Sequence, residues 1–169
     1  SSSEMTAAAL LDQKAATLYG QQTYGKGSMQ SFFELSDGSY LKLTVGHFLG
    51  PANTIINNVG LKPNVVTTGN PLAQAHFDTI TENYTNYSEK KNLLNVPTTK
   101  FFTINFNNDL AGATIQNNAV ELVQLGRDKV DISIKQVNKQ LIITPVKPLV
   151  AGQQYALLIH PGIKSADNM

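Results

Sequence analysis

The sequence predicts an α+β chain in which a first part of mixed helix and strand is followed by an all-β second part. Residues 1–13 are rich in alanine and begin with serines, a pattern typical of a capped helix. Residues 30–48 hold two extended runs on either side of Asp37 and Gly38, which together are a strong hairpin signal. From Val96 onward, apolar and polar residues alternate in short runs separated by turns, as in a β-sandwich.

Length and composition exclude several classes of function. A chain of 169 residues forms one large domain or two small ones, and 41% hydrophobic residues are enough for a globular core. A net charge of +1 predicts neither a nucleic-acid-binding surface nor a polybasic membrane patch. The absence of cysteine excludes disulfides, thiolate catalysis and cysteine-bearing zinc sites. The sequence contains no apolar run that approaches the ~20 residues of a membrane span.

The first part is expected to begin with a helix over residues 1–13, capped by Ser2 or Ser3, with Glu4 at the positive end of the helix dipole. Apolar residues surround almost the whole of this helix, which predicts that it is buried. The expected strands after it cover residues 15–19, 30–35 and 40–48.

A loop over residues 23–30 places Lys26 between two glycines. Glycine permits unusual backbone angles and a close approach of neighbouring chain, which an ordinary surface lysine does not need. A serine alcohol becomes a nucleophile when a base takes its proton, and a lysine can do so only when burial lowers its pKa from ~10.4. Ser1 lies 25 residues before Lys26, so the pair suggests a Ser-Lys nucleophile and base. By position alone, a helix cap and a solvated loop lysine are the plainer interpretations.

Residues 1–70 carry an ordered series of motifs. Ser-Glu opens an alanine-rich helix and is followed by Tyr-Gly-Lys-Gly-Ser-Met-Gln, Ser-Asp-Gly-Ser, Leu-Lys-Leu-Thr-Val and Gly-Leu-Lys-Pro-Asn-Val-Val. This series resembles the end of the catalytic domain of the C-terminal processing peptidases, also called tail-specific proteases. The resemblance implies a partial mixed α/β domain of the ClpP/crotonase-like type. It also implies a serine endopeptidase that works through an acyl-enzyme without a cofactor or metal.

The resemblance further implies roles for individual residues. The family's spacing places the nucleophile on Ser1 and the base on Lys26, and the family's supporting glutamine, four residues after the lysine, falls on Gln30. Backbone N–H groups at the start of the first helix are the expected oxyanion hole. The substrate, a protein or peptide, is expected to add as a strand beside an exposed edge.

The chain opens inside a helix cap, so we expect it to be a piece of a longer exported or cell-surface bacterial protein. Residues 1–70 hold little surface for a core of their own, and their strands would have unpaired edges. We therefore expect them to pair with a second copy or with the missing N-terminal half of the parent. The isolated piece is expected to be inactive.

The rest of the chain is expected to divide at residue 95. Proline at a first helical turn and apolar spacing predict a helix from Pro71 to Asn83, followed by a polar linker, so that residues 71–95 separate residues 1–70 from residues 96–169. Within 96–169, Phe-Thr-Ile-Asn-Phe, Leu-Ile-Ile-Thr-Pro and Leu-Val-Ala-Gly-Gln-Gln-Tyr resemble the Ig-like modules of bacterial surface and S-layer proteins. Such modules are typically spacers or binders. The alternative function is therefore a non-catalytic surface, adhesion or spacer module with a degenerate peptidase-like scaffold.

Other polar residues suggest no further chemistry. Three histidines lack metal-ligand spacing and are interpreted as satisfied or surface residues, and three aspartates do not form a calcium loop. These residues are His47, His76, His160, Asp109, Asp128 and Asp131. Tyr84 and Tyr87 fall within two glycosylation-acceptor patterns and are expected to pack on a neighbouring surface instead.

Overall fold

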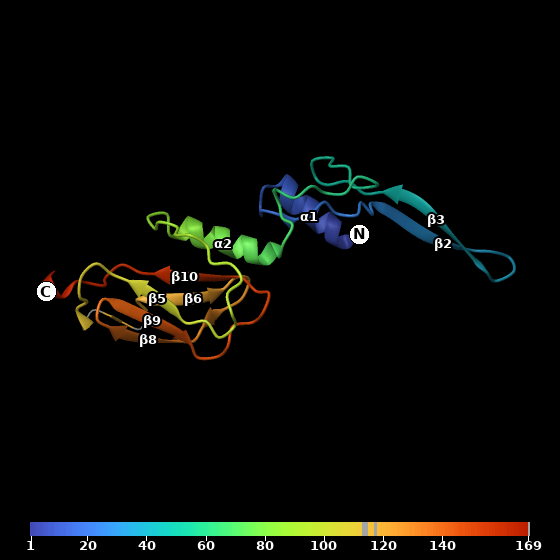
Figure 1. The fold of residues 1–169 in the computed structure, drawn as a ribbon. Coiled ribbons are helices and arrows are strands. Elements are labelled where there is room, and N and C mark those ends of the chain that lie inside the picture. The colour runs from blue at the N-terminus through green and yellow to red at the C-terminus, as the bar shows by residue number, and fades with distance from the viewer. Residues whose placement is uncertain (113–114, 117, 169) are drawn as a thin grey trace. The chain divides into compact units, whose positions relative to one another are not determined.

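The computed structural model describes residues 1–112, 115–116 and 118–168. The chain forms two compact units, Ser1–Pro71 (unit 1) and Leu72–Met169 (unit 2), and Figure 1 labels both α-helices and most of the strands. Unit 1 mixes helix and strand, and strands are the main regular structure of unit 2, as the sequence predicts. The finer division at residues 70 and 95 stays a prediction.

Unit 1 is built on one helix and two short pairs of strands. Helix α1 spans Ser2–Asp12. Its small core consists of Ala8, Ile56 and Leu61, with Ala7 and Phe48 at the edge. Strand β1 (Tyr19–Gly20) pairs in parallel with β4 (Val65–Val66), and β2 (Ser28–Glu34) pairs antiparallel with β3 (Tyr40–His47).

Three expectations for this unit were wrong in detail. The N-cap of α1 is Ser1, which accepts the Glu4 N–H, and not Ser2 or Ser3. The strand expected over residues 15–19 is limited to β1, because its partner β4 is only two residues long. Helix α1 is also less buried than expected, since Glu4 and Ala8 are its only buried residues and Met5 is 45% exposed.

The predicted hairpin is confirmed, and Figure 1 shows it extending away from α1. The turn has Gly38 at φ +82°, and the Asp37 carboxylate accepts hydrogen bonds from the N–H and hydroxyl of Ser39. Along β3 every residue but Gly46 is exposed. The hairpin therefore has little of unit 1 packed against either of its faces.

Unit 2 is a sandwich of two three-stranded antiparallel sheets, in the orders β10-β6-β7 and β5-β9-β8. Buried Leu110, Val120, Leu141 and Ile143 form the core, against which partly buried residues of both sheets pack. The strands are β5 (Phe102–Asn105), β6 (Val120–Gln124), β7 (Lys129–Val130), β8 (Ile132–Val137), β9 (Gln140–Pro145) and β10 (Tyr155–Ile159). A short 3-10 helix, η2 (Ala166–Asn168), follows.

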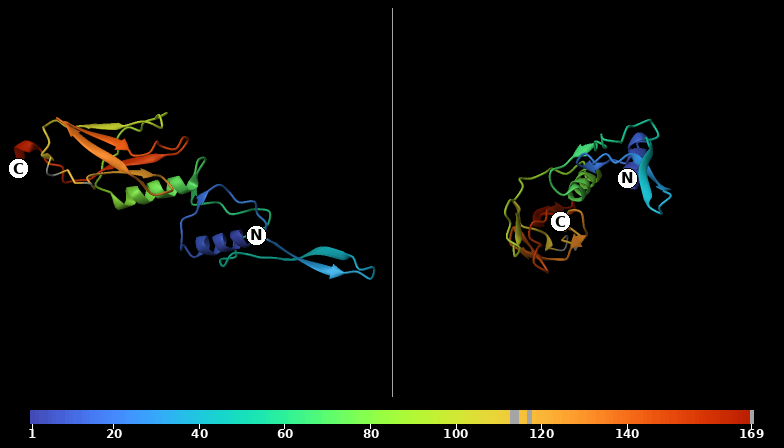
Figure 2. Two further views of the ribbon diagram at one scale, coloured as in Figure 1. Left: turned by 90° about the horizontal axis from the view of Figure 1, so that it is seen from below. Right: turned by 90° about the vertical axis from the view of Figure 1, so that its right-hand side faces the viewer.

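Helix α2 spans Pro71–Asn83, as predicted, and lies beside the sandwich in Figures 1 and 2. It contributes buried Ala73. None of the helices in the described residues combines the length and the apolar character needed to cross a membrane.

Candidate active site

The start of α1 and the lysine loop are joined by the carboxylate of Glu4, which is only 6% exposed. Its Oε1 accepts hydrogen bonds from the Thr23 hydroxyl at 2.7 Å and the Gly25 N–H at 2.6 Å. Its Oε2 accepts from the Lys26 N–H at 3.0 Å and from the Ser1 hydroxyl at 3.2 Å. One side chain thus joins two segments that lie about twenty residues apart in the sequence.

These hydrogen bonds determine the charge of Glu4. They lower its pKa from 4.5 to about 2, chiefly through the Thr23 hydroxyl and the Gly25 N–H, while burial opposes the shift. Glu4 is therefore an anion at neutral pH, and it acts as an acceptor for the loop rather than as a general acid.

The glycine before the lysine is required by a close backbone approach. Gly25 has φ +89°, and a Cβ placed there would lie 2.7 Å from the Gly60 nitrogen and 2.9 Å from the Val59 nitrogen. Gly25 also accepts the Asn58 N–H through its carbonyl. The loop therefore packs between α1 and residues 56–60. This confirms that glycine at position 25 permits a close approach of neighbouring backbone.

Ser1 and Lys26 are brought together at the level of the backbone. The nitrogen of Ser1 donates a hydrogen bond to the carbonyl oxygen of Lys26. The Ser1 hydroxyl, however, lies against Glu4, both as donor to its carboxylate and as acceptor of its N–H. The structure places the two residues side by side without joining their side chains.

The side chains of Lys26 and Gln30 both lie in exposed positions. The expectation that Lys26 points inward is thus not met in this chain, because unit 1 provides no layer over that side of the loop. Gln30 lies in β2, where a bulge between Met29 and Gln30 shifts the register and pairs Gln30 with Thr44. The roles of both residues stay predictions.

A second carboxylate fixes the other end of α1. Asp12 accepts the Ala52 N–H at 3.0 Å and the Thr54 hydroxyl at 2.6 Å, and these bonds lower its pKa. Sequence reasoning missed both Asp12 and the Glu4 network. The signal for Glu4 was the Ser1 to Glu4 capping-box spacing, whereas nothing local marks Asp12 because its partners lie about forty residues away.

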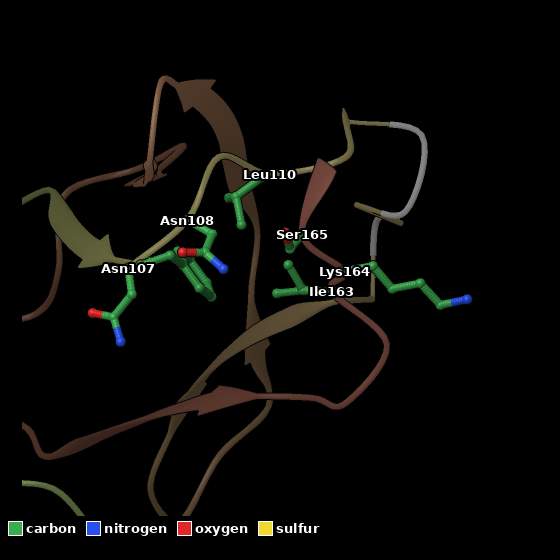
Figure 3. A pocket seen from close by; sticks show the side chains of 7 residues that line it. Asn107, Asn108, Leu110, Ile163, Lys164 and Ser165 are labelled. Carbon is green, nitrogen blue, oxygen red and sulfur yellow. The ribbon is translucent and has the colours of Figure 1, made fainter. Parts of the chain in front are cut away.

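Two pockets of unit 2 are lined by residues other than the predicted site residues. One pocket has a volume of about 190 Å³. In Figure 3, Leu110 and Ile163 point into it while Lys164 points away. A second pocket of about 230 Å³ is lined by residues around Leu149 and Tyr155. Both are smaller than the roughly 300–1,000 Å³ of ordinary ligand sites.

Comparison with known families gives two matches. Residues 1–67 match Peptidase family S41, and residues 78–169 match the family described as bacterial Ig-like domain. The chain belongs to the bacterial Ig-like domain family, and its residues 1–67, called here the S41 segment, are similar to Peptidase family S41. The expected resemblances are confirmed for both parts, although the match to the Ig-like domain begins within α2 rather than at residue 96.

Several curated proteins resemble the S41 segment. "Carboxyl-terminal-processing peptidase 2, chloroplastic" of Arabidopsis thaliana is 55% identical over 64 residues, which are 38% of this chain and 12% of that protein. The "Carboxyl-terminal-processing protease" of Picosynechococcus sp. is 39% identical over 82 residues, or 48% of this chain and 20% of that protein. The chain therefore spans a fifth or less of the length of these relatives.

Among solved structures, a chain titled photosystem II D1 C-terminal processing protease is 41% identical. The match covers 40% of this chain and 18% of that chain, with a TM-score of 0.38.

Proposed function

We propose that the S41 segment is the C-terminal part of the catalytic domain of an exported serine endopeptidase that cleaves protein or peptide substrates. The observation that carries the proposal is the Glu4 network, which fixes the lysine loop against the start of α1 and sets Ser1 beside Lys26. It lies within the residues that match Peptidase family S41. The ClpP/crotonase-like architecture of the complete domain is part of the proposal.

In this mechanism, neutral Lys26 takes the proton of the Ser1 hydroxyl as the Ser1 oxygen attacks the peptide carbonyl carbon. Backbone N–H groups at the start of α1 stabilise the resulting oxyanion. The protonated lysine then gives its proton to the departing amine, and water hydrolyses the acyl-enzyme with Lys26 again as base. Gln30 supports the geometry as a hydrogen-bond partner of the lysine or the serine.

Lys26 is exposed in this chain, so the mechanism requires a further layer that covers the loop and removes water from the amine. We propose that the isolated chain is inactive, because without this layer the amine stays hydrated. The layer would also hold the catalytic groups in place, and a displacement of ~1 Å in such a site costs about 100-fold in rate.

We propose that this layer, and the layer over the hairpin, come from the peptidase sequence that the relatives carry outside the matched segment. The register places Phe33, Leu41 and Leu43 on one hairpin face, and each is 44–47% exposed. A second copy of this chain is the alternative partner for this face, and a dimer by light scattering would favour it.

The test is peptide cleavage by the longer protein that contains this segment together with the upstream half. Lys26→Ala is expected to lower kcat/KM by about 10²–10⁴-fold, the usual contribution of a general base. Lys62→Ala, which removes another exposed lysine of unit 1, serves as the control and should leave the rate unchanged. Equal rates for the wild type and Lys26→Ala would reject the dyad.

A second candidate is a non-catalytic surface, adhesion or spacer module. Two observations favour it. The Lys26 side chain is exposed to water, and the Ser1 hydroxyl donates to Glu4 rather than to a base, as expected of a degenerate site. Retention of the chain by cell-wall material or an extracellular protein, with no cleavage by the longer protein, would support this function. Cell fractionation would test the proposed export.

A further inference from the structure

The first turns of helix α2 contact the sandwich of unit 2. His76 Nδ1 accepts the Gly126 N–H at 3.0 Å, and Gly126 lies in the turn between β6 and β7. A Cβ at Gly126 would lie 3.2 Å from the Ala73 nitrogen and 3.3 Å from the Leu72 Cγ. Ala73 itself is 2% exposed. The helix and this turn are therefore in direct contact, and a Cβ at Gly126 would fit only if its neighbours moved slightly.

A second contact fastens the turn that follows α2. The Tyr87 hydroxyl is hydrogen-bonded to His160 Nδ1 at 2.7 Å, and the Tyr84 ring packs against both, with centroids 4.8 Å from Tyr87 and 5.6 Å from His160. Burial raises the pKa of Tyr87, so its hydroxyl stays protonated. His160 directly follows β10, and its N–H bonds to the Ala119 carbonyl. The polar segment expected to be a linker thus begins as part of the sandwich.

Shortly before α2 the chain passes through two exposed residues. The Thr67 N–H still bonds to the Gly20 carbonyl of unit 1. Thr68 and Gly69 are exposed, and a Cβ at Gly69 would have nothing within 4 Å. Glycine also has the widest choice of backbone angles.

We propose that Thr68 and Gly69 form a hinge. In this proposal, α2 and the turn through Tyr87 move as one rigid body with the Ig-like sandwich. The matched Ig-like domain then has a structural N-terminus at α2 rather than inside it.

Residual dipolar couplings and ¹⁵N relaxation of the full chain test this directly. Couplings of residues 73–83 should fit the alignment tensor of β5–β10. Order parameters should be near ~0.85 in α2 and below ~0.6 at Thr68 and Gly69. Helix couplings that fit unit 1, or neither unit, would overturn the proposal, as would a rigid Thr68 and Gly69.

A pair of glycine variants tests which contact holds the helix. Gly126→Ala should speed amide exchange across α2 by on the order of tenfold, because its Cβ meets Ala73. Gly152→Ala is the matched control, since Gly152 has a similar φ of +73° but nothing within 4 Å of a Cβ. If Gly126→Ala impairs folding, His76→Ala removes the acceptor instead and should have the same local effect. Equal amide exchange rates in α2 for these variants and the control would contradict the claim that the Gly126 contacts hold α2 on the sandwich.

Discussion

Glu4 Oε1 lies 2.6 Å from the amide nitrogen of Gly25, and this is the shortest of the contacts by which the carboxylate holds the lysine loop. The contact joins a helix N-terminus to a loop whose neighbouring amide, that of Lys26, bonds to the other carboxylate oxygen. The position of Lys26 relative to Ser1 therefore depends on the Glu4 side chain as well as on the bond from the Ser1 nitrogen to the Lys26 carbonyl.

Glu4→Gln tests this dependence. The substituted amide presents a donor where the carboxylate accepted from several N–H and O–H groups, so at least one donor of the loop or helix start is left unpaired. We expect amide exchange at Gly25 and Lys26 to rise on the order of tenfold. Glu34→Gln, at an exposed position in β2, is the control and should leave the loop amides unchanged.

Acid should release the same loop. The folded-state pKa of Glu4, about 2, lies below its ordinary value of 4.5. The stability that ionised Glu4 contributes is therefore complete above pH ~4.5 and is lost as the pH falls towards about 2. The Gly25 and Lys26 amide resonances should titrate with a midpoint near pH 2. A midpoint near 4.5 would mean that the network does not form in solution.

Asp12 and Asp37 allow a comparison of two carboxylates with like partners. Each accepts one backbone N–H and one hydroxyl, but Asp12 reaches forty residues along the chain and Asp37 only two. Asp12→Asn should loosen the segment around Ala52 and Thr54 and lower the melting temperature of unit 1. Asp37→Asn should change only the hairpin turn. An equal fall in melting temperature for both variants would show that the long-range contact of Asp12 does not stabilise unit 1 further.

The Ig-like core gives a prediction of stability alone. Leu141 is fully buried in β9, so Leu141→Ala should destabilise unit 2 by about 2–5 kcal/mol through lost burial and a cavity. Leu94→Ala, at a residue that is 83% exposed, makes the same chemical change and should fall within about 0.5 kcal/mol of the wild type. Hydrogen exchange of the core amides measures the free energy of unfolding of unit 2 in both variants.

The sequence predicts elements well where a local signal exists. The span of α2, the Asp37 turn, the packing of Tyr84 and Tyr87, and the all-β character of the residues after Val96 follow from such signals. Strand β6 was missed because Val120, Leu122 and Val123 are buried on both faces, which removes the alternation that marks a half-exposed strand.

The candidate site was only partly predictable for a different reason. Ser1, Lys26 and Gln30 come from spacing within a resemblance, and spacing does not say which way a side chain points. The exposure of Lys26 and of much of α1 depends on what packs against unit 1, and that is a property of tertiary structure. The Glu4 and Asp12 contacts likewise join segments that no local pattern connects.

The most direct measurement is covalent labelling of the longer protein by a fluorophosphonate, read by mass spectrometry of the peptide that contains Ser1. We predict one adduct, on the Ser1 oxygen, with a labelling rate that falls at least 100-fold in Lys26→Ala and is unchanged in Lys62→Ala. A labelling rate in Lys26→Ala equal to that of the wild type, or an adduct on another serine, would contradict the account.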